Sequence, residues 1–247
     1  MELIELKNKI IAHFTGTNEE LTSLLEIFND DTAVFPFNEY ELFITTLIAN
    51  QQLTFESYCE IRREYIQQNP NLWIFEISAP RGFGERFAQT FVLNKSSQLK
   101  PASKKLDPDY NGQYDLWYNG IRIEVKASRV VDSESNEPLY RKALSSNTKR
   151  SFLMNFQQLK PQCCDVFVWL AVYRDKISMW VLNSKDVLNH PDYSKGQHRG
   201  NSGNEGQLHI NQINIRSLDG FLLKNDDILK AIQKAYNRLK RSTKKRL

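Results

Sequence analysis

The sequence predicts an α/β protein in which a mixed, partly parallel sheet is flanked by helices and preceded by a helical region. Three observations support this fold class. Apolar residues recur every three or four positions through the first 70 residues, as in amphipathic helices. Two β-prone runs, 114–118 and 121–125, are separated by Asn119-Gly120, a strong hairpin signal. The run Val166–Tyr173 is nearly all apolar, which is typical of a strand covered on both faces.

Residues 1–70 form the expected helical region. Within it, the spacing predicts helices near 38–49 and 54–68, the second ending before Pro70. Residues 71–247 form the expected α/β core with a basic C-terminal tail. The two regions can also form one continuous domain, and the sequence leaves that alternative open.

Further elements follow along the α/β core. They are a strand at 72–77, a helix marked by Phe83, Phe87 and Phe91, a helix marked by Phe152, Phe156 and Leu159, strands at 176–182 and 207–210, and a final helix that opens at Asp226 and Asp227.

Composition indicates a folded protein of the cytoplasm. Hydrophobic residues make up 40% of the chain and charged residues 25%, which is ordinary for a globular protein. No apolar run approaches the roughly 18 residues that a membrane span needs. The first residues lack the pattern of a secretion signal. Only three cysteines occur, without zinc-ligand spacing, so we expect a reducing compartment, no disulfide framework and no membrane.

Charge is concentrated at the C-terminus. The net charge of the chain is +4, and the last ten residues hold six Lys and Arg residues and no acid. We call residues 238–247 the basic tail. Such a tail suits phosphate contacts that carry no sequence information, and it is equally typical of a solvated chain end.

The expected hairpin brings three chemically useful side chains to one face. With Asn119-Gly120 as a two-residue turn, Asp115 lies opposite Glu124. Because side chains alternate along a strand, Lys126 points to the same side as Glu124. The apolar residues of both strands point to the other face. An acid pair of this kind is also found on plain exposed hairpins, where nearby cations such as Arg122 neutralise it.

Two opposed carboxylates repel each other unless a cation lies between them. Carboxylate oxygens suit Mg²⁺, with Mn²⁺ as a substitute. A bound metal would activate water and offset charge on a phosphate, which is the requirement of phosphodiester hydrolysis. Lys126 could stabilise that charge or accept a proton, and the sequence does not decide between these roles.

The stretch from Tyr114 to Lys126 resembles the motif of the PD-(D/E)XK nuclease superfamily, which includes most type II restriction endonucleases. Asp115 takes the first acidic position, and Glu124-Val125-Lys126 takes the acid-X-Lys positions. One departure is that Gln113-Tyr114, and not proline, precede Asp115. A literal Pro-Asp occurs at Pro108-Asp109, which lies outside the hairpin geometry.

The resemblance implies a type II restriction endonuclease with a PD-(D/E)XK core. It would hydrolyse double-stranded DNA with Mg²⁺, leave a 5′-phosphate and act as a homodimer. By the family pattern Asp115, Glu124 and the backbone carbonyl of Val125 bind metal, and Glu85, from the preceding helix, adds a further acid. A repair or recombination nuclease of the same superfamily, or a DNA-binding protein without cleavage, remains the alternative.

Two polar segments have the donors and acceptors that read DNA. Each is also typical of an ordinary mobile loop. The candidate DNA-binding residues are Arg141, Lys142, Asn147, Lys149 and Arg150 in the first segment, and His198, Arg199, Asn201, Asn204 and Gln207 in the second, glycine-rich one.

Overall fold

The computed structural model describes residues 41–76, 82–196 and 205–244. The chain divides into two compact units, residues 1–58 and 59–247. The described part of the first unit holds α3 (Glu41–Ala49) and the start of α4 (Phe55–Gln68), which confirms the two expected helices within the described residues. The expected boundary at residues 70 and 71 stays a prediction.

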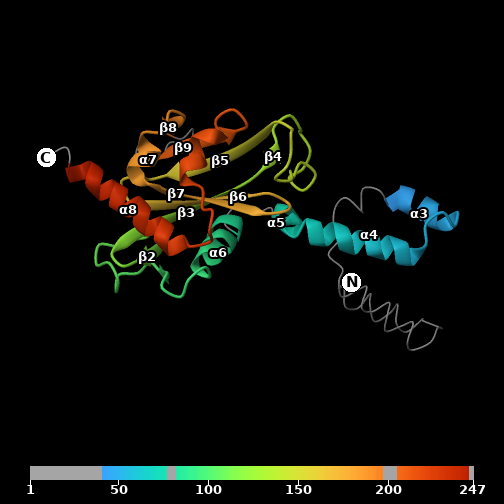
Figure 1. The fold of residues 1–247 in the computed structure, drawn as a ribbon, viewed down its shortest axis with the longest axis horizontal. Coiled ribbons are helices and arrows are strands. Elements are labelled where there is room, and N and C mark those ends of the chain that lie inside the picture. The colour runs from blue at the N-terminus through green and yellow to red at the C-terminus, as the bar shows by residue number, and fades with distance from the viewer. Residues whose placement is uncertain (1–40, 77–81, 197–204, 245–247) are drawn as a thin grey trace. The chain divides into compact units, whose positions relative to one another are not determined.

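Two sheets form the second unit (Figure 1). The first sheet has the order β1 (Lys100–Pro101), β2 (Leu116–Tyr118), β3 (Ile121–Arg129), β6 (Val166–Val172), β7 (Ile177–Asn183). Only its β3–β6 pair is parallel. The second sheet is antiparallel, with the order β4 (Val131–Asp132), β5 (Phe152–Leu159), β9 (Gly206–Asn211), β8 (Tyr193–Lys195).

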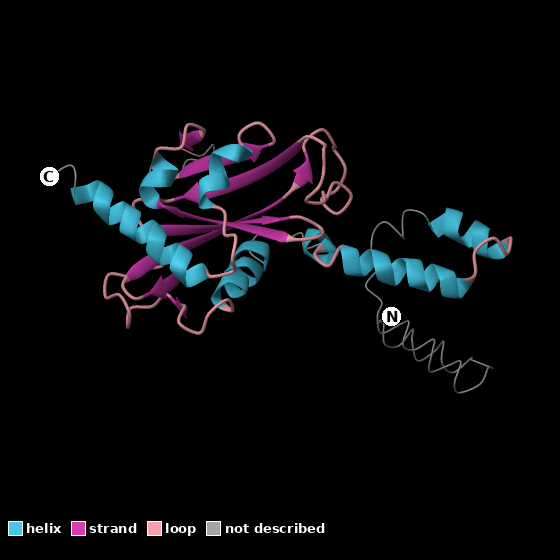
Figure 2. Cartoon of the chain, in the orientation of Figure 1, coloured by secondary structure: helices cyan, strands magenta, loops and turns pink. Residues whose placement is uncertain are grey.

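Helices cover the side of the first sheet that faces away from the second (Figure 2). They are the π-helix η1 (Gly82–Ala88), α6 (Gln89–Leu93) and α8 (Ile228–Lys244). Ala88, Val92, Ile228 and Ile232 pack there against Val125 and its apolar neighbours. The expected mixed sheet with flanking helices is confirmed, and the second sheet is an addition that the sequence did not indicate.

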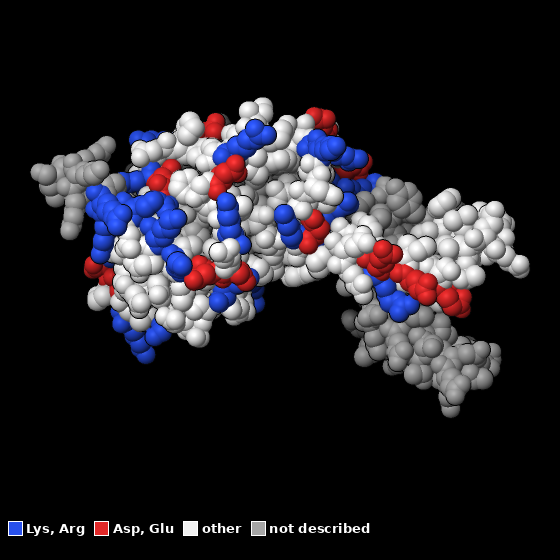
Figure 3. Space-filling view, viewed as in Figure 1, with Lys and Arg blue, Asp and Glu red and all other residues white. Residues whose placement is uncertain are grey.

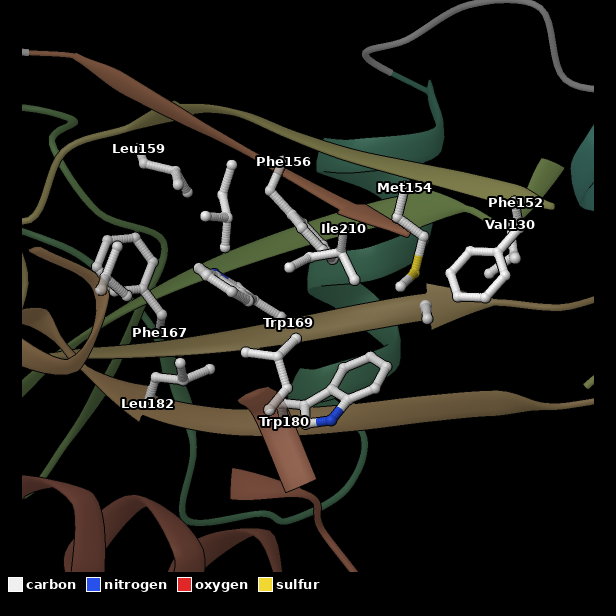
Figure 4. Packing of buried hydrophobic residues seen from close by; sticks show 14 of the residues in the cluster. Val130, Phe152, Met154, Phe156, Leu159, Phe167, Trp169, Trp180, Leu182 and Ile210 are labelled. Carbon is white, nitrogen blue, oxygen red and sulfur yellow. The ribbon is translucent and has the colours of Figure 1, made fainter. Parts of the chain in front are cut away.

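The space between the two sheets is the larger apolar core (Figure 4). Phe156 of β5 stacks on Trp169 of β6, with ring centroids 4.8 Å apart. Every residue of β6 is buried, as expected for a strand covered on both faces. Short helices α7 (Ser184–Leu188) and η2 (Ile215–Phe221) close the core through Val187 and Leu218.

The helix expected from Phe152, Phe156 and Leu159 is wrong, because this segment is strand β5. Phe152, Met154 and Phe156 alternate with less buried residues, which is the period of a strand. A bulge follows, where Gln158 has a φ of 54°. The extra residue returns Leu159 to the core and so imitates helical spacing.

The strand expected at 72–77 is also wrong, because Leu72–Glu76 form the short helix α5. Its start is fixed from outside the segment: the N–H of Asn71 donates to the carbonyl of Arg174, and its side-chain amide donates to the carbonyl of Tyr173. Tertiary contacts therefore decide the conformation of a run too short to show a period.

The other expected elements that fall within the described residues are confirmed, whereas residues 1–40 of the expected helical region lie outside them. The helix marked by Phe83, Phe87 and Phe91 is η1 followed by α6, the strands are β7 and β9, and the last helix is α8. Within the described residues no helix is both long and apolar enough to span a membrane.

Candidate metal centre

The hairpin of β2 and β3 sets the geometry of the site. Tyr118 pairs with Ile121, as expected from a two-residue turn at Asn119-Gly120. Both turn residues have positive φ, 47° and 82°, which such a turn requires. Beyond the last pair of β2, the N–H of Asp115 donates to the carbonyl of Ile123 at 3.0 Å. Asp115 is thus the first residue outside β2, it is bonded to the residue before Glu124, and its negative charge reaches Glu124.

The two faces of β3 have different surroundings: one faces the helices and the other faces the second sheet. Ile121, Ile123 and Val125 are buried under the helices. Because side chains alternate, Glu124 and Lys126 point to the side of the second sheet. The parallel pairing of Lys126 with Trp169, a residue of the core between the sheets, agrees with this placement.

Asp115 is held by two hydrogen bonds to its carboxylate. Its Oδ2 accepts from the N–H of Val125 at 2.7 Å, and its Oδ1 accepts from the side-chain amide of Gln89 at 2.7 Å. One bond fixes the acid to the next strand and the other to the first residue of α6. The carboxylate thus has a defined position, from which its charge reaches Glu124.

Glu124 is a buried acid beside a lysine. The Nζ of Lys126 lies 2.7 Å from its Oε1. Burial raises the pKa of Glu124 to about 7, opposed by Lys126 and reinforced by the negative charge of Asp115. A carboxyl held in this way gains from an added cation, because the cation would offset both the burial cost and the repulsion between the acids.

A second lysine approaches from the other sheet. Lys160 directly follows β5, and its Nζ lies 3.0 Å from Oε1 of Glu205. Its charge also reaches Glu124, whose pKa it lowers in part. The turn from Lys160 to Asp165 is bonded to β3, since Asp165 and Arg122 exchange hydrogen bonds at 2.9 Å. Sequence reasoning missed this approach because it took β5 for a helix.

Asp107, an acid that the sequence analysis did not single out, links the loop before the hairpin to β3. Asp107 is buried, and its Oδ2 accepts from the hydroxyl of Tyr114 at 2.8 Å and from Nε of Arg122 at 2.9 Å. Burial alone would raise the pKa of Asp107, yet these two partners and the N–H of Asp109 hold it below its ordinary value. The bridge joins the residue before Asp115 to β3.

The literal Pro-Asp sequence has a different place. Asp109 is exposed in the loop before the hairpin, and its N–H donates to Oδ1 of Asp107. Asp115, and not Asp109, is the acid whose charge reaches Glu124. Glu85 belongs to η1, and its side chain lies outside what the structure describes. Gln89, four residues later, is the residue from this helical segment that contacts Asp115.

The first candidate DNA-binding segment carries cations on its surface. Arg141 pairs with Glu137 at 3.1 Å and Arg150 with Asp132 at 3.4 Å. Asn147 accepts from the hydroxyl of Ser145, while Lys149 is exposed and Lys142 half-buried. In the second segment His198, Arg199, Asn201 and Asn204 lie outside the described residues, and Gln207 lies in β9.

Basic side chains also gather along α8 (Figure 3). Within the described residues this helix carries Lys230, Lys234, Arg238, Lys240 and Arg241. Arg238 is tied to the fold, because its guanidinium donates to Asp186 at 2.9 Å. The basic tail predicted from the sequence is therefore partly a helix packed on the sheet.

The described residues hold no large cluster of side chains that could bind a metal ion. Across residues 41–76, 82–196 and 205–244, no three His, Cys, Asp or Glu residues lie close enough together to hold an ion. The candidate centre is therefore a pair of carboxylates, with backbone, water or substrate oxygens left to complete the coordination. This is the usual way for a protein to hold Mg²⁺.

No protein-family model matches this sequence, and no curated protein matches it either.

Proposed function

We propose that the protein is a PD-(D/E)XK nuclease that hydrolyses phosphodiester bonds in double-stranded DNA with Mg²⁺, and most specifically a type II restriction endonuclease. The observation that carries the proposal is that the Asp115 carboxylate is bonded to the N–H of Val125, the residue between Glu124 and Lys126, while Lys126 lies 2.7 Å from Glu124. These three residues match the superfamily motif in type, order and hairpin placement.

The donor set fits a divalent ion. Asp115 and Glu124 are close enough for the charge of Asp115 to raise the pKa of Glu124. The N–H of Val125 points to Asp115. In a strand the N–H and carbonyl of one residue point to the same side, so we expect the carbonyl of Val125 to face Asp115 as well. Asp115, Glu124 and that carbonyl would be the ligands.

The chain's own groups supply the remaining chemistry. A bound Mg²⁺ lowers the pKa of water and offsets charge on the phosphate. Gln89 and the N–H of Val125 each donate to one carboxylate oxygen of Asp115. They fix the orientation of the carboxylate, and each oxygen keeps a lone pair that can bind a metal ion. Lys126, beside Glu124, either stabilises the phosphate charge or takes a proton from water. Mutation to arginine would separate these roles, because arginine keeps the charge but cannot act as a base.

By resemblance the active form would be a homodimer on double-stranded DNA. Two-fold symmetry of the protein suits a palindromic site. A repair or recombination nuclease of the same superfamily would use the same centre but would choose its substrate by DNA structure.

Digestion of phage DNA tests the proposal. We expect defined bands with Mg²⁺ or Mn²⁺, none with chelator, and binding without cleavage in Ca²⁺, whose longer bonds and looser geometry do not support the reaction. Glu124→Gln should be inactive. Asp226→Asn, which removes an acid paired with Lys95 on the helical side, should cut normally.

The outcomes separate the candidates. Defined bands support a restriction enzyme, whereas a smear or cleavage confined to branched DNA supports a repair nuclease. Full activity of Glu124→Gln, or cutting in chelator, would reject the proposed centre.

A further inference from the structure

Two cations beside the carboxylate pair share an arrangement that the motif does not account for. Arg122 lies two residues before Glu124 on the same strand face, and its Nε donates to Asp107. Lys160 approaches from the end of β5 and is held by Glu205. In each pair the acid is the more enclosed partner: the side chains of Asp107 and Glu205 are 5% and 12% exposed, against 37% and 39% for Arg122 and Lys160.

The arrangement places both cations at the same edge of the site. Arg122 is the second residue of β3, and Asp165, with which it exchanges hydrogen bonds, directly precedes the parallel strand β6. Lys160 opens the turn that ends at Asp165. Residues two apart on a strand face are about 7 Å apart, which is the separation expected between Arg122 and Glu124 on β3. Arg122 is thus tied to Glu124 by the strand, and Lys160 is tied to β3 by the turn that ends at Asp165, from where its charge reaches Glu124.

Neither cation is saturated by its acid. Of the five N–H groups of Arg122, Nε is the one bonded to a described side chain. The ammonium of Lys160 has three N–H groups, and Glu205 is the described acid that pairs with it. A buried acid that orients a half-exposed cation leaves its remaining donors directed to solvent, which reduces the entropy lost when an anion binds.

We infer that Arg122 and Lys160 contact the DNA phosphates that flank the scissile one, held ready for them by Asp107 and Glu205. The inference rests on the proposed DNA substrate and deepens it. These contacts position the backbone on the carboxylate pair, and they contribute affinity without reading sequence.

The salt dependence of binding tests the inference. Short mixed-sequence DNA duplexes are titrated with protein in Ca²⁺ at several salt concentrations. Each lost phosphate contact should reduce the slope of log Kd against log salt by about 0.9. We expect that reduction for Arg122→Gln and for Lys160→Gln, and about twice as much for both together.

Three controls accompany the test. Arg122→Lys and Lys160→Arg keep the charge and should keep the slope. Lys95→Gln removes an ion-paired lysine on the helical side and should leave the slope unchanged. Because Arg122→Gln leaves Asp107 without its cation and can unfold the protein, Asp107→Asn/Arg122→Gln is measured beside it. This double variant has the wild-type net charge, so a reduced slope would report a local contact.

The results distinguish this inference from the proposed nuclease function. If the wild-type protein cuts DNA and folded variants keep its slope, the phosphate contacts are rejected while the nuclease stands. If the slopes fall as expected but no metal ion supports cutting, the contacts stand and the nuclease is rejected. A slope reduced equally in Lys95→Gln would also overturn the inference, since it would show a general charge effect.

Discussion

The carboxylate of Asp115 accepts a hydrogen bond from the backbone N–H of Val125, with 2.7 Å between Oδ2 and N. The first acid of the candidate site is therefore bonded to the residue between the second acid and the lysine. A change at Asp115 removes a metal ligand and also a bond that holds the end of the hairpin together.

Asp115→Ala and Asp115→Asn should differ in stability but not in activity. Alanine leaves the N–H of Val125 and the amide of Gln89 without their acceptor, which costs about 1–3 kcal/mol. Asparagine keeps one oxygen and should cost less. Both should stop DNA cleavage. Urea unfolding and phage-DNA digestion measure the two effects, and an alanine variant as stable as wild type would show that the bond is not important to the fold.

The unfolding free energy should depend on pH through Glu124. Because burial raises its pKa to about 7, the folded protein holds a proton between roughly pH 4.5 and 7 that the unfolded chain releases. Stability contributed by this group is therefore present below pH 4.5 and is lost as the pH rises to 7, by about 1–3 kcal/mol. In chelator, Glu124→Gln should flatten this part of the profile. An unchanged profile in the variant would assign the pH dependence to other groups.

Gln89 should act on metal affinity. Its amide orients Asp115 from α6. Groups that orient a metal ligand typically contribute 10–100-fold in metal affinity or activity. Gln89→Leu should therefore need roughly that much more Mg²⁺ for half-maximal cleavage, with a similar rate at saturating metal. Thr90→Ala, at the exposed neighbouring position, is the matched control and should leave the Mg²⁺ requirement unchanged.

The stack of Phe156 on Trp169 should be a major contribution to stability. Both rings are buried between the sheets. Phe156→Ala should lower the unfolding free energy by about 3–5 kcal/mol. Ile213→Ala, at a position 83% exposed, should change it by less than about 0.5 kcal/mol. A small loss for Phe156→Ala would show that the sheets can close over the cavity.

Recognition of the DNA sequence and binding of DNA phosphates should depend on different segments, the glycine-rich segment around Arg199 and the basic tail. If Arg199 contacts a base edge, Arg199→Ala should lose about 1–3 kcal/mol of discrimination at one base position. Asn201→Ala is tested in the same way. Replacing Lys244, Lys245 and Arg246 with glutamine should weaken binding to all sequences alike. These substitutions are preferable to truncation after Tyr236, which would remove the bond from Arg238 to Asp186. Equal weakening by Arg199→Ala at every site would favour residues 141–150 as the reader.

The sequence predicted the hairpin well because its signals are local. Asn119-Gly120 specifies a turn, and the alternation on either side specifies which residues oppose each other, so the register of β2 and β3 followed without tertiary information. The apolar run of β6 was equally clear. Local patterns were sufficient wherever one signal had no competitor.

The rest depends on contacts between distant residues. The bulge at Gln158 gave β5 a helix-like spacing, so the segment was predicted as a helix. The second sheet, to which β5 belongs, was therefore not predicted. Asp107, Lys160 and Glu205 reach the site from loops and strand ends, where no period applies. Gln89 was not singled out either, although it lies four residues after Glu85, the residue of the same helical segment that was expected to serve the site.

Strand β3 serves two purposes at once: its odd-numbered residues from 121 to 125 pack under the helices, and Glu124 and Lys126 face the other sheet. A gain or loss of one residue in the hairpin would force a choice. If the apolar residues stay packed under the helices, Asp115 moves away from Glu124. If the two acids stay close together, the apolar residues turn to the other face of the sheet. Divergent relatives should therefore vary widely in loop lengths and still keep the eight residues between Asp115 and Glu124. A relative with an alignment gap in that interval should lack the proposed metal-dependent cleavage.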